Sequence, residues 1–248
     1  MERDIIYCQD ARHMVGVEDG SIQLVVTSPP YNVGKSYESP LVLKEYLAFL
    51  KEVWQECIRV LCPGGRLAVN VASTWRKPYI PLHAYIATQL IEELGLYMRG
   101  DIIWDKGPSV GVSTAWGSFA KASNPTLRDV HEFILVFSKD SPRLESNGRE
   151  SGITNKEFVE WTKSVWHFST ASPKQVGHPA PFPEELPRRL ILLYTNVGDL
   201  VLDPFMGSGT TAVAAMKTRR HYVGYDVVEE YCAAARERVR DGGPAAGV

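Results

Sequence analysis

The sequence predicts an α/β fold, in which a mostly parallel β-sheet carries helices, and three observations lead to it. The chain has 248 residues, of which 44% are hydrophobic and 23% charged, as is typical of one large globular domain. Short apolar runs alternate with segments of helical spacing, a pattern typical of β and α units around a parallel sheet. No internal repeat or low-complexity tract interrupts this pattern. We therefore expect a single domain over residues 1–248.

The elements before residue 105 follow from apolar spacing and from proline and glycine. Residues 22–27 (IQLVVT) predict a buried strand, which ends there because the two prolines that follow cannot donate to a sheet ladder. Apolar residues from Tyr46 to Leu61 recur at i, i+3 and i+4, which predicts a helix that residues 63–65 (PGG) terminate. Three more elements follow on the same criteria: a strand over 66–71, a helix over 81–94 with Gly95 as its C-cap, and a strand over 97–104.

Two segments in the middle of the chain lack sustained periodicity. Residues 106–128 contain three basic residues, no acid and many Gly, Ser and Ala, and this loop is far longer than the usual connection. Such loops tend to be functional. Residues 139–177 carry six basic and five acidic residues, which predicts an insertion, with a short helix over 153–165. A strand over 131–137 (HEFILVF) separates the two segments.

The last third of the chain returns to alternating elements. Helical spacing resumes over residues 183–194, and a strand over 199–203 leads into a glycine-rich turn over 205–209. A helix, a strand over 221–226 and a final helix over 229–240 complete the predicted fold.

Charge and cysteine content restrict the setting in which the protein works. The net charge is −2 and the pI about 6.3, so any nucleic-acid contact needs positive charge that is local. The four cysteines form no CxxC pair and lack partners at metal-ligand spacing, which predicts neither disulfides nor a metal site. The acidic N-terminus and the absence of an 18-residue apolar run predict a cytoplasmic protein without a membrane segment.

The glycine-rich turn predicts a nucleoside-binding site. Asp203 ends one strand, Phe205, Gly207, Gly209 and Thr210 follow, and Asp226 ends the next strand. Glycines at such a turn let a ligand approach the backbone, and an acid at the second strand end can accept hydrogen bonds from ribose hydroxyls. The turn lacks the lysine of a phosphate-binding loop, so a ligand with adenosine and no phosphates fits, and S-adenosylmethionine is one. Alternatively, the glycines only cap the helix and Asp226 is a solvated strand end.

A second motif, Thr27-Ser28-Pro29-Pro30-Tyr31-Asn32, follows the strand over residues 22–27. It therefore lies at the carboxyl edge of the sheet, where the glycine-rich turn also opens. The two prolines fix the backbone and remove two N–H donors, which leaves an acceptor-rich patch beside an exposed aromatic ring. Such a patch suits a flat substrate that donates from an amine, such as a nucleobase. For the hexapeptide taken alone, a simple turn is the favoured interpretation.

Together the two motifs resemble those of the amino-methylating DNA methyltransferases. That family carries an (Asp/Asn/Ser)-Pro-Pro-(Tyr/Phe/Trp) catalytic motif and a Phe-x-Gly-x-Gly cofactor motif, and the order of the two here is like that of its β group. Asp10, residues 131–137 and His178-Pro179 look like further family motifs, although the Gln and Lys that usually follow the last one are missing. The resemblance implies a Rossmann-like, mixed, mostly parallel seven-stranded sheet with helices on both faces, the catalytic half preceding the cofactor half.

The resemblance also implies roles for the residues that match the motifs. Ser28, Pro29, Pro30 and Tyr31 would be catalytic, with Ser28 and the Pro29 carbonyl accepting from the target amine and Tyr31 stacking on a flipped-out base. S-adenosyl-L-methionine would be held by Asp10, Thr27, Asp203, Phe205, Gly207, Gly209, Thr210 and Asp226. Serine at position 28 is similar to the members that methylate cytosine N4, and adenine N6 is the alternative. Carbon methylation of cytosine is disfavoured because no Pro-Cys dipeptide occurs.

Double-stranded DNA is the partner that the resemblance implies. The loop over 106–128 would face DNA through Trp116, Lys121 and Arg128, unless Trp116 is anchored in the fold and the cations only face solvent. Residues 139–177 would be the target-recognition region, and its candidate contacts are Arg143, Arg149, Lys156 and Lys163. A restriction endonuclease with the same site and a homodimer are further partners that these residues do not reveal. An RNA or small-molecule methyltransferase and a non-catalytic DNA-binding relative are the lower-ranked alternatives.

Overall fold

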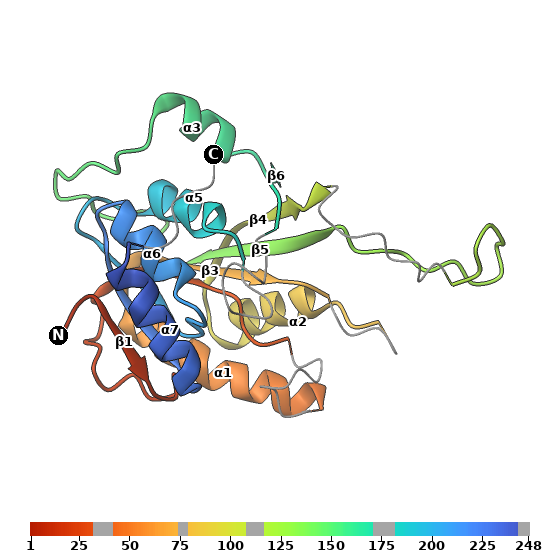
Figure 1. The fold of residues 1–248 in the computed structure, drawn as a ribbon, viewed down its shortest axis with the longest axis horizontal. Coiled ribbons are helices and arrows are strands. Elements are labelled where there is room, and N and C mark those ends of the chain that lie inside the picture. Colours follow the sequence, from red (N-terminus) through yellow and green to blue (C-terminus); the bar gives the residue numbers. More distant parts are fainter. Residues whose placement is uncertain (32–41, 74–78, 108–116, 171–181, 243–248) are drawn as a thin grey trace.

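A computed structural model of the protein describes residues 1–31, 42–73, 79–107, 117–170 and 182–242 (Figure 1). In these ranges one mixed sheet has eight strands in the order β1-β8-β7-β2-β3-β5-β4-β6. The strands are β1 (Ile5–Cys8), β2 (Ile22–Thr27), β3 (Leu61–Val71), β4 (Tyr97–Asp105), β5 (His131–Ser138), β6 (Val165–His167), β7 (Leu200–Asp203) and β8 (His221–Asp226). The expected count of seven was wrong by one, because the segment over 139–177 contributes the edge strand β6.

One strand runs against the others. β5 is antiparallel to both of its neighbours, β3 and β4, whereas every other neighbouring pair in the sheet is parallel. The carboxyl ends of seven strands and the amino end of β5 therefore meet at one edge, which we call the carboxyl edge. Binding sites in open α/β sheets form outside this edge.

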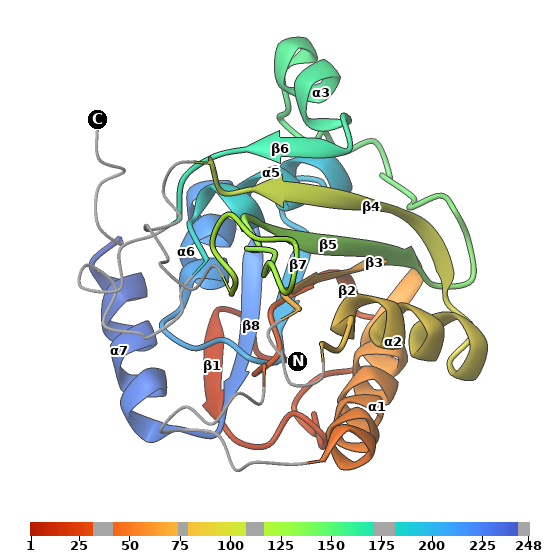
Figure 2. The same ribbon diagram turned by 90° about the vertical axis from the view of Figure 1, so that its right-hand side faces the viewer.

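Helices cover both faces of the sheet (Figure 2). Side chains of successive strand residues point to opposite faces, so Val25 packs in one core cluster whereas Leu24 and Val26 pack in the other. The first face carries α1 (Leu43–Val60) and α2 (Leu82–Thr88), which continues as a π-helical turn over Gln89–Glu93. The second face carries α5 (Glu185–Tyr194), α6 (Thr210–Lys217) and α7 (Glu229–Arg240).

The longest helix shows why these segments fold as they do. Along α1 the residues at helical spacing, Tyr46, Leu50, Val53, Trp54 and Cys57, are all buried, while charged residues occupy the opposite side. Burial of this apolar stripe, more than intrinsic propensity, stabilises such a helix. Within the described ranges, none of the helices is long and apolar enough to cross a membrane.

Two predicted boundaries differ in the structure, the end of the first long helix and the start of the strand after it. α1 ends at Val60 and β3 begins at Leu61, so the Pro63-Gly64-Gly65 run lies inside the strand and not between helix and strand. Gly64 has φ +77 and donates its N–H to the Lys139 carbonyl, which turns the strand start toward the segment after β5. That segment carries the predicted short helix, α3 (Asn155–Trp161), which has a Thr154 and Glu157 capping box, and then β6.

Candidate active site

The two sequence motifs meet at the centre of the carboxyl edge. β2 and β7 are parallel neighbours, so the residues at their carboxyl ends lie side by side. The Thr27 hydroxyl donates to Asp203 Oδ1 at 2.7 Å, although the two residues are 176 positions apart in the chain. The Ser28 motif and the glycine-rich turn therefore form one site, as their positions at strand ends predict.

Asp203 is a buried residue that connects several parts of this site through hydrogen bonds. Its side chain is almost fully buried, and besides Thr27 it accepts from the Thr211 hydroxyl at 2.6 Å and the Phe205 N–H at 3.0 Å. Burial raises the pKa of Asp203 to about 6, even though the three donors favour the charged form. Asp203 thus ties the start of the glycine-rich turn to the catalytic motif and to α6.

The turn itself is fastened to the end of β8. Gly207 donates its N–H to Asp226 Oδ2 at 2.8 Å, and Val228 donates to Asp226 Oδ1 at 3.0 Å, so each carboxylate oxygen keeps one lone pair. Phe205 lies half-buried near the rings of Phe49 and Trp54, with centroids 6.0 and 6.3 Å away. An apolar ring, a glycine turn and an acceptor carboxylate together fit a ligand that combines an adenosine with a polar tail.

Gly209 is required by packing as well as by conformation. It has φ +83, and a Cβ at this position would lie 2.9 Å from the Ala235 Cβ on α7. We expect Gly209→Ala to lower the free energy of unfolding by about 1–3 kcal/mol more than Gly95→Ala does. Gly95 is the matched control because it has φ +71 and open space around it. Equal losses in urea denaturation would contradict the close approach of α6 and α7.

Two candidate cofactor residues make contacts that fix them within the protein. The Thr210 side chain is buried, and its hydroxyl accepts from Arg238 on α7 at 2.9 Å. Asp10 follows β1, and Arg12 donates to both of its oxygens, which holds the pKa of this carboxyl below its ordinary value. Arg12 also lies 5.7 Å from the centre of the Phe49 ring, so Asp10 is joined to the rings around Phe205.

The Ser28 motif is part of a hydrogen-bonded network. Ser28 Oγ lies 2.9 Å from Tyr31 Oη, which donates to Glu132 Oε2 at 3.1 Å. Asn70 Nδ2 donates to the same Glu132 oxygen at 2.6 Å, and Lys106 Nζ contacts Glu132 Oε1 at 2.9 Å. The Tyr31 ring was expected to be exposed, but it is half-buried because its hydroxyl points toward Glu132.

Sequence reasoning gave no role to Asn70, Lys106 or Glu132. Asn70 is near the carboxyl end of β3, Lys106 follows β4, and Glu132 is the second residue of β5. Glu132 reaches the carboxyl edge only because β5 is antiparallel, which brings its amino end beside the other strand ends. A polar residue at the start of an otherwise apolar strand was the signal available in the sequence.

Comparison with known proteins decides the family. Residues 22–237 match the family described as DNA methylase. This chain belongs to the DNA methylase family.

Individual relatives agree with this membership. The DNA methylase is 32% identical to the type II methyltransferase M.MjaI of Methanocaldococcus jannaschii, over 88% of this chain and 85% of the relative. It is 31% identical to the type II methyltransferase M.HpaI of Haemophilus parainfluenzae, over 96% of this chain and 74% of that one.

Solved structures give the same result. The Thermus thermophilus protein TTHA0409, described as a DNA modification methylase and solved with S-adenosyl-L-methionine, superposes with a TM-score of 0.74 at 30% identity. The match covers 97% of this chain and 96% of that chain. The cytosine-N4-specific PvuII DNA methyltransferase shares the fold, with a TM-score of 0.76 at 22% identity over 98% of this chain and 92% of that chain.

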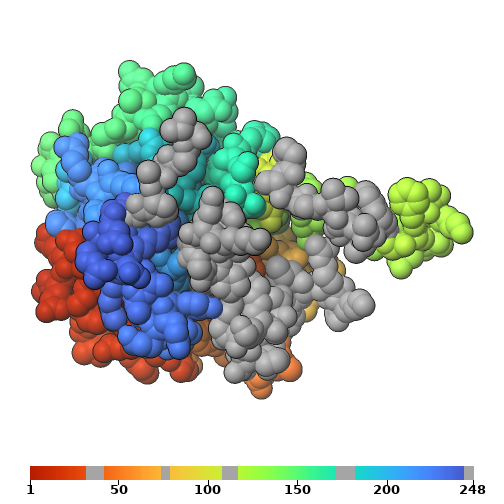
Figure 3. Space-filling view, viewed as in Figure 1, coloured from red at the N-terminus to blue at the C-terminus, as the bar shows by residue number. Residues whose placement is uncertain are grey.

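Two of the candidate DNA contacts of the methylase lie on a projecting arm. Residues 117–130 extend from the carboxyl edge beyond the ends of β4 and β5 (Figures 1 and 3), and both Lys121 and Arg128 are exposed there. The Ser118 hydroxyl shapes the tip, since it donates to the Lys121 carbonyl at 2.7 Å and accepts from Asn124 N at 2.8 Å. Trp116 lies outside the described residues. Lys106, the third cation of the segment, is paired with Glu132.

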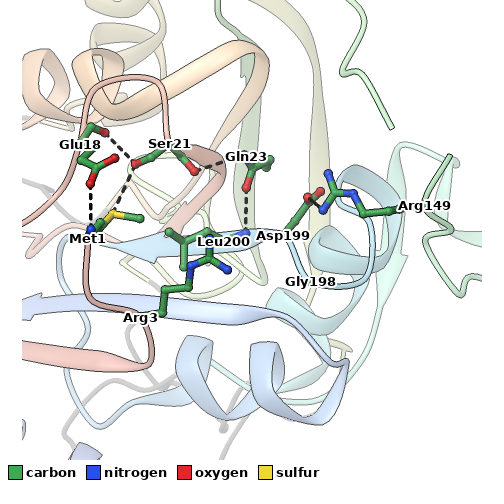
Figure 4. Close-up of a pocket in the computed structure, with 9 residues that line it drawn as sticks. All are labelled: Met1, Arg3, Glu18, Ser21, Gln23, Arg149, Gly198, Asp199 and Leu200. Carbon is green, nitrogen blue, oxygen red and sulfur yellow. Dashed lines mark hydrogen bonds and ion pairs between the residues drawn. The ribbon is translucent and has the colours of Figure 1, made fainter. Parts of the chain in front are cut away.

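The other candidate contacts do not lie beside the catalytic motif. Arg149 forms an ion pair with Asp199, which precedes β7 at the opposite edge of the sheet, in the polar hollow shown in Figure 4. Arg143 follows the carboxyl end of β5, and its backbone adjoins Gly64 at that same edge. Lys156 lies on α3, which packs on α5, and Lys163 follows α3 and pairs with Glu160 at 2.6 Å.

A different part of the segment over 139–177 reaches the site. β6 is parallel to β4, so it carries the chain back to the carboxyl edge, where His167 Nδ1 lies 3.0 Å from Asp105 Oδ2. Residues 171–177 lie outside the described residues. Basic composition alone does not reveal which edge of the sheet each residue reaches, so a DNA contact by Arg143, Arg149, Lys156 and Lys163 stays a prediction.

Proposed function

We propose that this DNA methylase transfers a methyl group from S-adenosyl-L-methionine to the exocyclic N4 amine of a flipped-out cytosine in duplex DNA. The observation that carries the proposal is the Thr27 to Asp203 hydrogen bond, which holds the Ser28 acceptor beside the glycine-rich turn. The choice of cytosine over adenine rests on serine at the first position of the motif. Adenine N6 is the alternative product that the experiment below distinguishes.

The chemistry needs acceptors for the target amine. The amine of a nucleobase is a poor nucleophile, because its lone pair is delocalised into the ring. Ser28 Oγ and the Pro29 carbonyl accept its hydrogens and hold it in line with the methyl group as it becomes pyramidal. S-adenosyl-L-methionine supplies an activated methyl group on a sulfonium, which direct displacement by the amine transfers.

The methyl donor fits the residues around the glycine-rich turn. The remaining lone pairs of Asp226 would accept from the ribose hydroxyls, and the ring of Phe205 would lie against the adenine. At Gly207 the turn has no side chain, so its backbone would let the rest of the donor approach closely. Asp203 stays below this surface and shapes the turn.

The target base leaves the double helix to reach this edge. Flipping costs a few kcal/mol, and stacking on an aromatic ring recovers about 1–3 kcal/mol. Tyr31 offers the face of its ring to the base. The hydrogen bond from its hydroxyl to Glu132 fixes the orientation of the ring.

A nucleoside analysis tests the proposed product. The protein is incubated with duplex DNA and S-adenosyl-L-methionine labelled on the methyl group, and the DNA is digested and separated into nucleosides. We expect label in N4-methylcytosine. Label in N6-methyladenine would overturn the base assignment, and label in neither would overturn the proposed function.

Charge reversal on the arm tests its contact with DNA. We expect Lys121→Glu combined with Arg128→Glu to weaken DNA binding and to reduce the slope of log affinity against log salt by about 2, since each phosphate contact contributes about 0.9. The matched control is Lys156→Glu on α3 with Lys163→Glu after it, which we expect to leave the slope unchanged. A slope that changes only in the control pair would place DNA on α3 instead.

A further inference from the structure

The hydrogen atoms of the catalytic network can be assigned from its geometry. Tyr31 Oη has one hydrogen, and Glu132 Oε2, 3.1 Å away, can only accept as a carboxylate, so Tyr31 donates to Glu132. The contact of 2.9 Å between Ser28 Oγ and Tyr31 Oη then requires Ser28 to donate to Tyr31. Asn70 Nδ2 lies 3.5 Å from Ser28 Oγ and takes up one of its lone pairs, which leaves the other to face a substrate. A serine in isolation could equally turn its hydrogen toward the target amine.

The side chain of Glu132 is held in place by two neighbouring side chains. Lys106 contacts one of its oxygens and Asn70 the other, and the side chains of Glu132 and Lys106 are only 14% and 16% exposed. Asn70 Nδ2 also lies 3.3 Å from Tyr31 Oη, the oxygen between Ser28 and Glu132, and so helps to hold that hydroxyl in place. Asn70 on β3, Lys106 directly after β4 and Glu132 on β5 are each held by the sheet, so the sheet fixes the orientation of the Tyr31 hydroxyl.

We propose that Glu132 is the positioning residue that, through Tyr31, turns the Ser28 hydrogen away from the target amine and finally accepts that amine's surplus proton. The inference rests on the proposed amine methylation. As the new N–C bond forms and the methyl–sulfur bond breaks, the amine becomes positively charged. It loses one proton to Ser28 Oγ, while the Ser28 hydrogen moves to Tyr31 and the Tyr31 hydrogen moves to Glu132. Glu132 later releases this proton to water, which restores the starting state.

Two variants test this hydrogen-bonded network, one at Glu132 and one at Tyr31. Glu132→Gln keeps an acceptor oxygen but cannot take up a proton, and Tyr31→Phe keeps the ring but removes the connecting hydroxyl. We expect each to lower the single-turnover rate of methyl transfer to DNA at least tenfold, with cofactor affinity, measured by calorimetry, within twofold of wild type. Glu132→Asp keeps a carboxylate and should recover part of the rate that Glu132→Gln loses, a rescue that a merely structural role of Glu132 would not give.

The control is Glu93→Gln, on the first face of the sheet, where Glu93 pairs with Lys51 at 2.7 Å. We expect it to keep the wild-type rate. If wild type methylates an amine of either base but either variant stays within twofold of it, or if Glu132→Asp is as slow as Glu132→Gln, the role of Glu132 is wrong while the proposed function stands. If wild type methylates neither amine, the proposed function fails and this inference with it.

Discussion

Ser28→Ala is expected to lower the rate of methyl transfer to DNA about a hundredfold or more, with cofactor affinity within twofold of wild type. The substitution removes the acceptor oxygen that faces the amine in the transition state, and loss of one such preorganised group typically costs about 10²–10³ in rate. Cofactor affinity is spared because the bond between Thr27 and Asp203 is independent of the Ser28 side chain. Single-turnover kinetics and calorimetry measure the two quantities.

The matched control is another serine on the same sheet. Ser138 is buried at the far end of β5, and its hydroxyl has no hydrogen-bond partner among the residues that the structure describes. We expect Ser138→Ala to keep the wild-type rate. Loss of cofactor binding in Ser28→Ala would instead give Ser28 a structural role in the turn, and an unchanged rate would remove it from catalysis.

Asp203→Asn is expected to change how the free energy of unfolding depends on pH. Burial raises the pKa of Asp203 from its ordinary value of 3.8 to about 6, so the folded protein binds this proton more tightly than the unfolded chain does. Between about pH 4 and pH 6 the unfolded chain has already lost the proton, so raising the pH lowers the stability of the wild type by on the order of 3 kcal/mol. Asparagine has no such proton.

The difference between variant and wild type is the quantity to measure. Urea denaturation from pH 4 to pH 7 should show the asparagine variant gaining stability relative to wild type up to about pH 6, and no further gain above it. In Thr211→Val one donor that favours the charged form is lost, so the window should extend to higher pH. A constant difference between Asp203→Asn and wild type at every pH would show that burial does not dominate at Asp203.

Local signals were sufficient for many elements. The strands at Ile22–Thr27 and His221–Asp226 and the helix at Glu229–Arg240 have the predicted bounds, since the apolar spacing of each lies within its own segment. The meeting of the Ser28 motif with the glycine-rich turn was also predictable, because both follow parallel strands. The direction of a strand was sufficient to place the residues near its end.

Other features depend on pairings that no local pattern encodes. Glu132 joins the site because β5 pairs antiparallel with β3, and that direction cannot be read from an apolar run. The same holds for β6, whose three residues pair with β4 and carry His167 to the site. Arg143 and Arg149 were predicted from charge alone, and their positions depend on where the chain leaves β5.

The central position of β2 has a consequence for how the protein is made. β2 is buried on both faces and pairs with β3 on one side and β7 on the other, yet β7 is synthesised more than 170 residues later. Until then β2 is an edge strand with unpaired backbone groups, which favours wrong association between nascent chains. Because contacts so distant in sequence also form slowly, overexpression at low temperature or with chaperones should raise the yield of folded protein.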